Sequence, residues 1–84
     1  MRVTVELTYD MSRALGIDRF DVDDVATVKD LIAKAHERVG PTFEAETRLA
    51  AVAVNGVLMS YQSGLRTRLA DGDRVSFVKA AAGG

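Results

Sequence analysis

The sequence predicts an α+β fold in which a mixed sheet of four to five strands packs on one main helix. Three observations predict it: strand-like alternation at the N-terminus, a capped amphipathic stretch in the middle, and short alternating segments with tight turns after it. Because the chain has only 84 residues, we expect one domain with one core. We place that domain at residues 1–79 and a flexible tail at residues 80–84.

The N-terminal part predicts a hairpin with a long loop. Residues 2–9 alternate between polar and apolar side chains, ending on Tyr9, which is the period of a strand with one buried face. Residues 11–16 form a connector with room for one helical turn. Residues 19–23 alternate again and predict the second strand.

The main helix begins after Thr27. Thr27 and Asp30 match a capping box, in which each side chain satisfies a free backbone N–H of the other residue. Gly40-Pro41 supplies the stop, so the helix has about 12 residues. Its apolar residues fall at helical spacing on one face. They are Val28, Leu31, Ile32, Ala35 and Val39.

Strands return after the helix. Residues 41–48 are polar and mixed, and we expect a loop there. Residues 49–54 form an apolar run of strand length. Asn55-Gly56 favours the positive backbone angles of a tight hairpin turn, so residues 57–59 are predicted to return as a short strand.

The last strand is predicted at residues 74–79. Residues 61–68 look irregular, and Asp71-Gly72-Asp73 is typical of a turn. A hairpin followed by one helix and a return to strands must bury the apolar stripe of the helix on one face of a single sheet. This order describes a β-grasp fold, in which the first and last strands would be central and parallel.

Composition excludes several classes of function. The chain has no cysteine, which removes disulfides, thiolate metal sites and a cysteine nucleophile. The net charge of -1 with scattered cations gives no basic stripe for nucleic acid, and no apolar run is long enough to cross a membrane. His36 is the single histidine, so we expect no metal site. A chain of this size also lacks room for a cleft enzyme with its own cofactor, and we expect a cytoplasmic protein that is not an enzyme and binds no cofactor stably.

Several motifs resemble one known family. Leu69–Phe77 followed by Gly83-Gly84 resembles the close of the MoaD/ThiS family of ubiquitin-like sulfur carriers. Val52–Gly56 resembles the middle strand and turn of that family. The stretch Arg13–Gly16 and the helix start at Thr27-Val28 fit its MoaD branch better than its shorter ThiS branch. The resemblance covers essentially the whole chain, and the order and spacing of these short motifs make it specific.

The resemblance implies a role for Gly84. In such carriers a MoeB/ThiF-like activating enzyme uses ATP and magnesium to adenylate the terminal carboxylate, which then becomes a thiocarboxylate. The sulfur would go to a larger synthase subunit, first of all in molybdopterin biosynthesis. Other readings stay open: a carrier for thiamine or another sulfur-containing metabolite, a ubiquitin-like modifier attached to lysines, or a plain β-grasp interaction domain whose ending is incidental.

The tail and one sheet face are the predicted contact surfaces. Gly83 and Gly84 lack Cβ, so their backbone can approach the catalytic groups of another protein closely. The segment Lys79-Ala80-Ala81-Ala82 replaces the proline-rich sequence common in MoaD-type members, and residues 80–84 reach at most about 17 Å when extended. If Val75 and Phe77 face the core, Val78 lies on the opposite face of the sheet. Leu58 and Ala53 are predicted to join Val78 in contacting partners.

Overall fold

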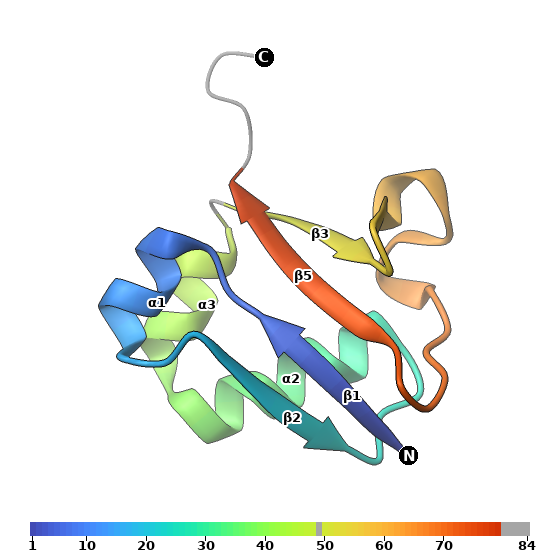
Figure 1. The fold of residues 1–84 in the computed structure, drawn as a ribbon, viewed down its shortest axis with the longest axis horizontal. Coiled ribbons are helices and arrows are strands. Elements are labelled where there is room, and N and C mark those ends of the chain that lie inside the picture. The colour runs from blue at the N-terminus through green and yellow to red at the C-terminus, as the bar shows by residue number, and fades with distance from the viewer. Residues whose placement is uncertain (49, 80–84) are drawn as a thin grey trace.

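The computed structural model describes residues 1–48 and 50–79 of the chain as a five-stranded mixed sheet with helices behind it (Figure 1). The strands are β1 (Arg2–Glu6), β2 (Arg19–Asp23), β3 (Ala50–Val54), β4 (Val57–Leu58) and β5 (Arg74–Lys79). Their order in the sheet is β2-β1-β5-β3-β4. Since β1 and β5 pair in parallel and the other neighbours pair antiparallel, the predicted β-grasp arrangement is confirmed.

Three α-helices accompany the sheet in residues 1–48 and 50–79. They are α1 (Tyr9–Leu15), α2 (Val28–Val39) and α3 (Pro41–Thr47), and two 3-10 turns follow at Met59–Tyr61 and Gly64–Arg66. In Figure 1, α2 crosses behind the sheet, and α1 and α3 pack together at one end. The opposite, outer face of the sheet carries no helix among the described residues (Figure 1).

The predicted cap and apolar face of α2 are confirmed. The Asp30 amide donates to the Thr27 hydroxyl at 3.2 Å, and the Thr27 amide donates to the Asp30 carboxylate at 3.2 Å. These two bonds satisfy N–H groups that have no partner within the helix. Val28, Leu31 and Ala35 are completely buried and hold the helix on the sheet.

The inner face of the sheet supplies the rest of the core. Alternate residues of β1, β2, β3 and β5 point toward α2, because successive side chains of a strand project to opposite faces of the sheet. The buried strand residues are Val3, Val5, Phe20, Val22, Val52, Val54, Val75 and Phe77. Burying a side chain of this size stabilises the fold by roughly 1.5–3 kcal/mol relative to leaving it exposed.

The prediction of a loop over residues 41–48 is wrong, because Pro41–Thr47 form α3. Gly40 has φ of 93°, which redirects the chain after α2, and Pro41 occupies the first helical turn, where its fixed φ and missing N–H are tolerated. Phe43 anchors the helix: it is completely buried and meets Phe77 edge-to-face, with ring centroids 5.5 Å apart. One buried aromatic in a polar segment therefore converts an apparent loop into a short helix.

The first strand is shorter than predicted, and the connector is more helical. β1 ends at Glu6, and Thr8 caps α1 by accepting a hydrogen bond from the Met11 amide at 3.0 Å. Met11 is 1% exposed, whereas Tyr9, which alternation placed on the buried face, is 71% exposed. The helical spacing from Thr8 to Met11 thus overrides the period-two pattern at the end of the strand.

The return hairpin has the predicted turn. Asn55 and Gly56 have φ of 51° and 85°, as the dipeptide predicts. The second arm is shorter than expected, because β4 stops at Leu58 and Met59 begins a 3-10 turn. β3 is described from Ala50, and Leu49 lies outside the described residues.

Candidate functional site

The predicted reactive end of the chain follows β5. Ala80, Ala81, Ala82, Gly83 and Gly84 lie outside the described residues. Lys79 is the last described residue; it is exposed and pairs with Ala50 of β3. β5 is the central strand of the sheet and runs parallel to β1. Lys79, at its end, therefore lies at the end of the sheet opposite the N-terminus (Figure 1).

The two faces of β5 are oriented as predicted. Val75 is completely buried and Phe77 is 3% exposed, so both face the core. Val78 is 39% exposed on the outer face, and Ser76 is half-buried beside it. The predicted register of β5, on which the proposed contact role of Val78 depends, is therefore confirmed.

The outer face next to Val78 is apolar. Val78 pairs with Ala51 of β3, and Ala53 lies between Ser76 of β5 and Leu58 of β4. Directly opposed residues of antiparallel strands project to the same face, so these side chains share one surface. We call Ala51, Ala53, Leu58 and Val78 the apolar half of the outer face. Ala51 was not singled out from the sequence, although alternation with Val52 would have found it.

The members of the apolar half differ in how much surface they offer. Leu58 is half-buried, like Ala51. Ala53 lies on the predicted face but is only 6% exposed, so it presents little area and forms the floor of this surface. A partner contact at Ala53 stays a prediction. Val78 therefore offers the most accessible apolar side chain of this half.

Hydrogen bonds occupy the other half of the outer face, on β2, β1 and the start of β5. The Ser76 hydroxyl donates to Glu6 Oε1 at 3.0 Å, and the Arg74 guanidinium lies 3.8 Å from Glu6 Oε2. The Thr4 hydroxyl donates to Asp21 Oδ1 at 3.0 Å. Arg2 and Asp23 form the last pair on this surface: Arg2 Nε donates to Asp23 Oδ1 at 3.2 Å. This hydrogen bond raises the pKa of Arg2. We call Arg2, Thr4, Glu6, Asp21, Asp23, Arg74 and Ser76 the polar half.

A second set of hydrogen bonds holds the start of β5 in place. The side-chain amide nitrogen of Asn55 donates to Asp73 Oδ1 at 2.9 Å. Asn55 Oδ1 in turn accepts from the backbone amide of Arg74 at 2.9 Å. Asp73 Oδ2 accepts from the Ala70 amide at 2.7 Å. These bonds join the Asn55-Gly56 turn to the Asp71-Gly72-Asp73 turn. Together the two turns fix where β5 begins and which way it runs.

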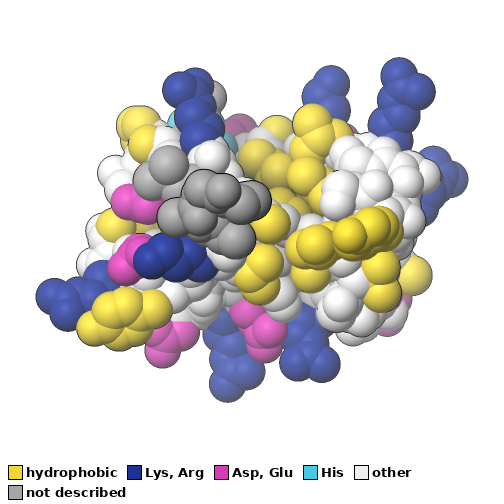
Figure 2. Space-filling view, turned by 90° about the horizontal axis from the view of Figure 1, so that it is seen from above, with side chains coloured by type: hydrophobic (Ala, Val, Ile, Leu, Met, Phe, Trp, Pro, Cys, Tyr) yellow, Lys and Arg dark blue, Asp and Glu magenta, His cyan; other side chains and the backbone are white. Residues whose placement is uncertain are grey.

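The space-filling view shows where hydrophobic side chains gather at one end of the molecule. Figure 2 looks down on the end of the sheet where β5 finishes, and hydrophobic side chains gather over its right-hand half. Figure 1 places β3 and the 3-10 turns on this side. The exposed apolar residues of β4 and the 3-10 turns include Val57, Tyr61 and Leu65.

Residues 1–48 and 50–79 contain no group of three His, Asp or Glu side chains placed to hold a metal ion. His36 lies half-buried on α2. No helix in this part of the chain is long and apolar enough to span a membrane.

The family model of the ThiS family matches residues 13–84. The chain belongs to the ThiS family. This is a family of small ubiquitin-like sulfur-carrier proteins, which agrees with a carrier rather than a catalytic role. The match runs through Gly83 and Gly84, and it includes the joined turns and β5 described above. No curated protein matches this ThiS-family chain by sequence.

Solved structures extend the comparison over the full length. The BexX/CysO complex of Amycolatopsis orientalis matches with 26% identity and a TM-score of 0.81, covering 98% of this chain and 99% of that one. The complex of subunits 1 and 2 of the molybdopterin-converting factor of Helicobacter pylori matches with 25% identity and a TM-score of 0.69, covering both chains fully.

An archaeal modifier shares the fold as well. Small archaeal modifier protein 1 of Methanosarcina acetivorans matches with a TM-score of 0.85 at 18% identity, covering 99% of this chain and 96% of that one. Two of these three similar structures are complexes with other proteins.

Proposed function

We propose that this chain carries sulfur as a thiocarboxylate on Gly84. The observation that carries the proposal is the family match, which continues through Gly83-Gly84 to residue 84. The position of Lys79 at the end of the central strand supports it, because the following residues then start from a rigid part of the fold. An apolar surface next to that point offers a place for a partner to dock.

The chemistry takes two steps on a separate activating enzyme. The Gly84 carboxylate attacks the α-phosphorus of ATP, held with magnesium on a MoeB/ThiF-like enzyme, and releases pyrophosphate. Sulfide then attacks the acyl carbon of the adenylate, forming a C–S bond as the C–O bond to AMP breaks. The carrier contributes its carboxylate and its docking surface, and the catalytic groups belong to the partner.

The sulfur acceptor proposed first is the larger subunit of molybdopterin synthase. The similarity to subunit 1 in the Helicobacter pylori complex, at 25% identity over the whole of both chains, supports this acceptor. A second acceptor of the BexX kind has comparable support, because the CysO complex matches at 26% identity. Transfer of sulfur from the loaded carrier to each acceptor in parallel would distinguish the two pathways.

Intact mass tests the proposal directly. We expect incubation with ATP, magnesium, sulfide and a cognate activating enzyme to add about 16 Da, the difference between sulfur and oxygen. A variant lacking Gly84 is the matched control, and it should fold normally yet gain no mass. Absence of the adduct while a known carrier is converted in parallel would overturn the proposal. Formation of an isopeptide with a lysine amine would indicate a protein modifier instead.

A further inference from the structure

β2 is one of the two edge strands of the sheet, on the far side from β3 and β4, and within the described residues it pairs with β1 alone. The hydrogen bond from the Leu7 amide to the Asp18 carbonyl, at 3.0 Å, sets the phase of the β1–β2 ladder. In an antiparallel ladder alternate residues bond toward the partner strand. The N–H and C=O groups of Arg19, Asp21 and Asp23 consequently point away from β1, along the open edge.

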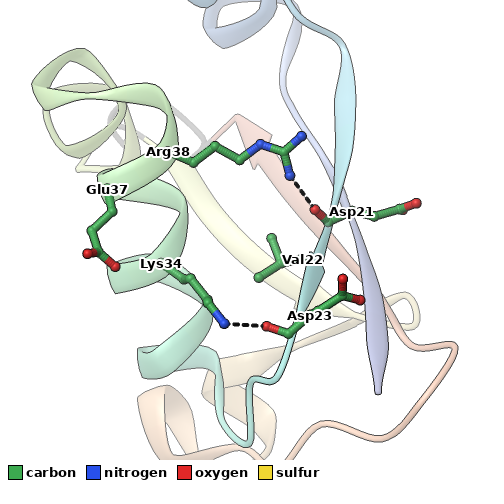
Figure 3. Close-up of a pocket in the computed structure, with 6 residues that line it drawn as sticks. All are labelled: Asp21, Val22, Asp23, Lys34, Glu37 and Arg38. Carbon is green, nitrogen blue, oxygen red and sulfur yellow. Dashed lines mark hydrogen bonds between the residues drawn. The ribbon is translucent and has the colours of Figure 1, made fainter.

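Two cations from α2 reach this edge. Arg38 donates to the Asp21 carbonyl at 2.6 Å, and Lys34 donates to the Asp23 carbonyl at 2.7 Å (Figure 3). Four residues of helix rise about 6 Å, and two residues of strand rise about 6.7 Å. The two periods match closely, so successive cations of one helix face meet alternate carbonyls of the strand.

A groove of about 440 Å³ lies between α2 and β2, and its charged lining comprises the cations Lys34 and Arg38 and the carboxylates Asp21, Asp23 and Glu37. The carboxylates of Asp21 and Asp23 are bonded to β1 side chains on the outer face, and Glu37 points away from β2 (Figure 3). Lys34 and Arg38 are the charged groups that extend across the groove. Both cations bond to backbone carbonyls, and the Arg38 guanidinium also lies over the Phe20 ring, 5.3 Å from its centroid. Neither positive charge is bonded to a carboxylate within the described residues.

We propose that this edge binds an extended peptide segment of a partner protein that carries carboxylates at alternate positions. The segment adds to β2 as a sixth strand, and its amides take over the carbonyls of Asp21 and Asp23. Lys34 and Arg38 then turn to the carboxylates, whose spacing of about 6.7 Å along the strand matches theirs. This site is separate from the tail and from the apolar half, and it does not depend on the proposed sulfur chemistry.

Nuclear magnetic resonance of the full chain tests the site. The probe is an end-blocked eight-residue peptide of alternating threonine and glutamate, and the matched control replaces every glutamate with glutamine. We expect the glutamate peptide to shift the amide signals of Arg19, Asp21 and Asp23 and to slow their hydrogen exchange. The affinity should fall as salt is added, because both cations are exposed to solvent.

Two outcomes of the peptide titration would overturn the proposal. One is an absence of shifts at the β2 amides, which would mean that Lys34 and Arg38 only protect the edge from pairing. The other is equal binding of the glutamine peptide, which would remove the charge-based recognition. This comparison uses the unmodified chain, so it stays decisive even where a variant folds poorly.

Variants locate the contact. The double variant Lys34→Gln/Arg38→Gln should bind the glutamate peptide roughly tenfold more weakly or worse. Lys29→Gln, on the same helix but outside the groove, is the matched control and should bind like the unchanged chain. Val78→Asp should also leave the affinity unchanged, and a loss there would place the peptide on the outer face and contradict the proposal.

Discussion

The outer face of the sheet is divided into two halves that differ in how their side chains are satisfied. In the polar half, Glu6 is bonded to Ser76 and lies close to Arg74, and Thr4 is bonded to Asp21. In the apolar half the side chains have no polar groups to satisfy. A partner that covered the polar half would have to strip water from charges already paired, whereas covering the apolar half only removes apolar surface from water. The comparison therefore favours docking on the apolar half.

The largest effect should separate the inner face from the outer. Phe77→Ala removes the ring that packs on Phe43, and we expect the free energy of unfolding to fall by about 3–5 kcal/mol. Urea denaturation measures it. Val78→Ala is the control on the neighbouring position of β5 and should cost under about 0.5 kcal/mol. The reverse order of these two values would mean that the faces of β5 have been exchanged.

Ala53→Asp tests whether the floor of the apolar half is closed. Because Ala53 is 6% exposed between Leu58 and Ser76, a carboxylate there loses its water, and we expect about 2 kcal/mol of destabilisation. Ala53→Ser provides a smaller polar control with a lower cost. A melting temperature equal to that of the unchanged chain would show that the floor opens readily to solvent.

Val78→Asp should act on binding rather than on folding. At 39% exposure the charge stays in water in the free protein, so unfolding should change by under about 0.5 kcal/mol. In a docked complex the same charge is buried against apolar surface, and affinity for the activating enzyme should fall by about 2 kcal/mol. Titration calorimetry measures this loss, and unchanged affinity would move the docking site elsewhere.

Glu6→Gln should have the smallest effect. The carboxamide oxygen can still accept from Ser76, and only the ion pair with Arg74 at 3.8 Å is lost. Such exposed pairs contribute about 0–1 kcal/mol, so unfolding should shift by no more than that. Partner affinity should stay constant. A drop comparable to that of Val78→Asp would show that the polar half also takes part in docking.

Local signals in the sequence were sufficient for much of the fold. The Thr27–Asp30 box and the spacing of Val28, Leu31 and Ala35 predicted α2 because capping and helical periodicity act over a few residues. β5 was predicted with its observed bounds and with the observed orientation of Val78. Strand alternation and turn residues are local too, and they require no knowledge of distant partners.

Short helices were harder to predict because distant contacts stabilise them. Among the side chains described in residues 41–48, only Phe43 is buried, and its partner Phe77 lies in β5 at the far end of the sequence. α1 likewise depends on the burial of Met11. An isolated helix of seven residues is marginal in water, so tertiary packing decides whether it forms.

In the candidate site, too, some features follow from the sequence and others from the tertiary structure. The Gly83-Gly84 pair and the family resemblance were recognised from the sequence alone, because short ordered motifs are properties of the covalent chain. The pairing of Ala51 with Val78, the closed floor at Ala53 and the bonded polar half were decided by strand register. The positioning of Lys34 and Arg38 on the β2 carbonyls depended on how α2 crosses the sheet. Such contacts join residues far apart in sequence, and no local pattern encodes their geometry.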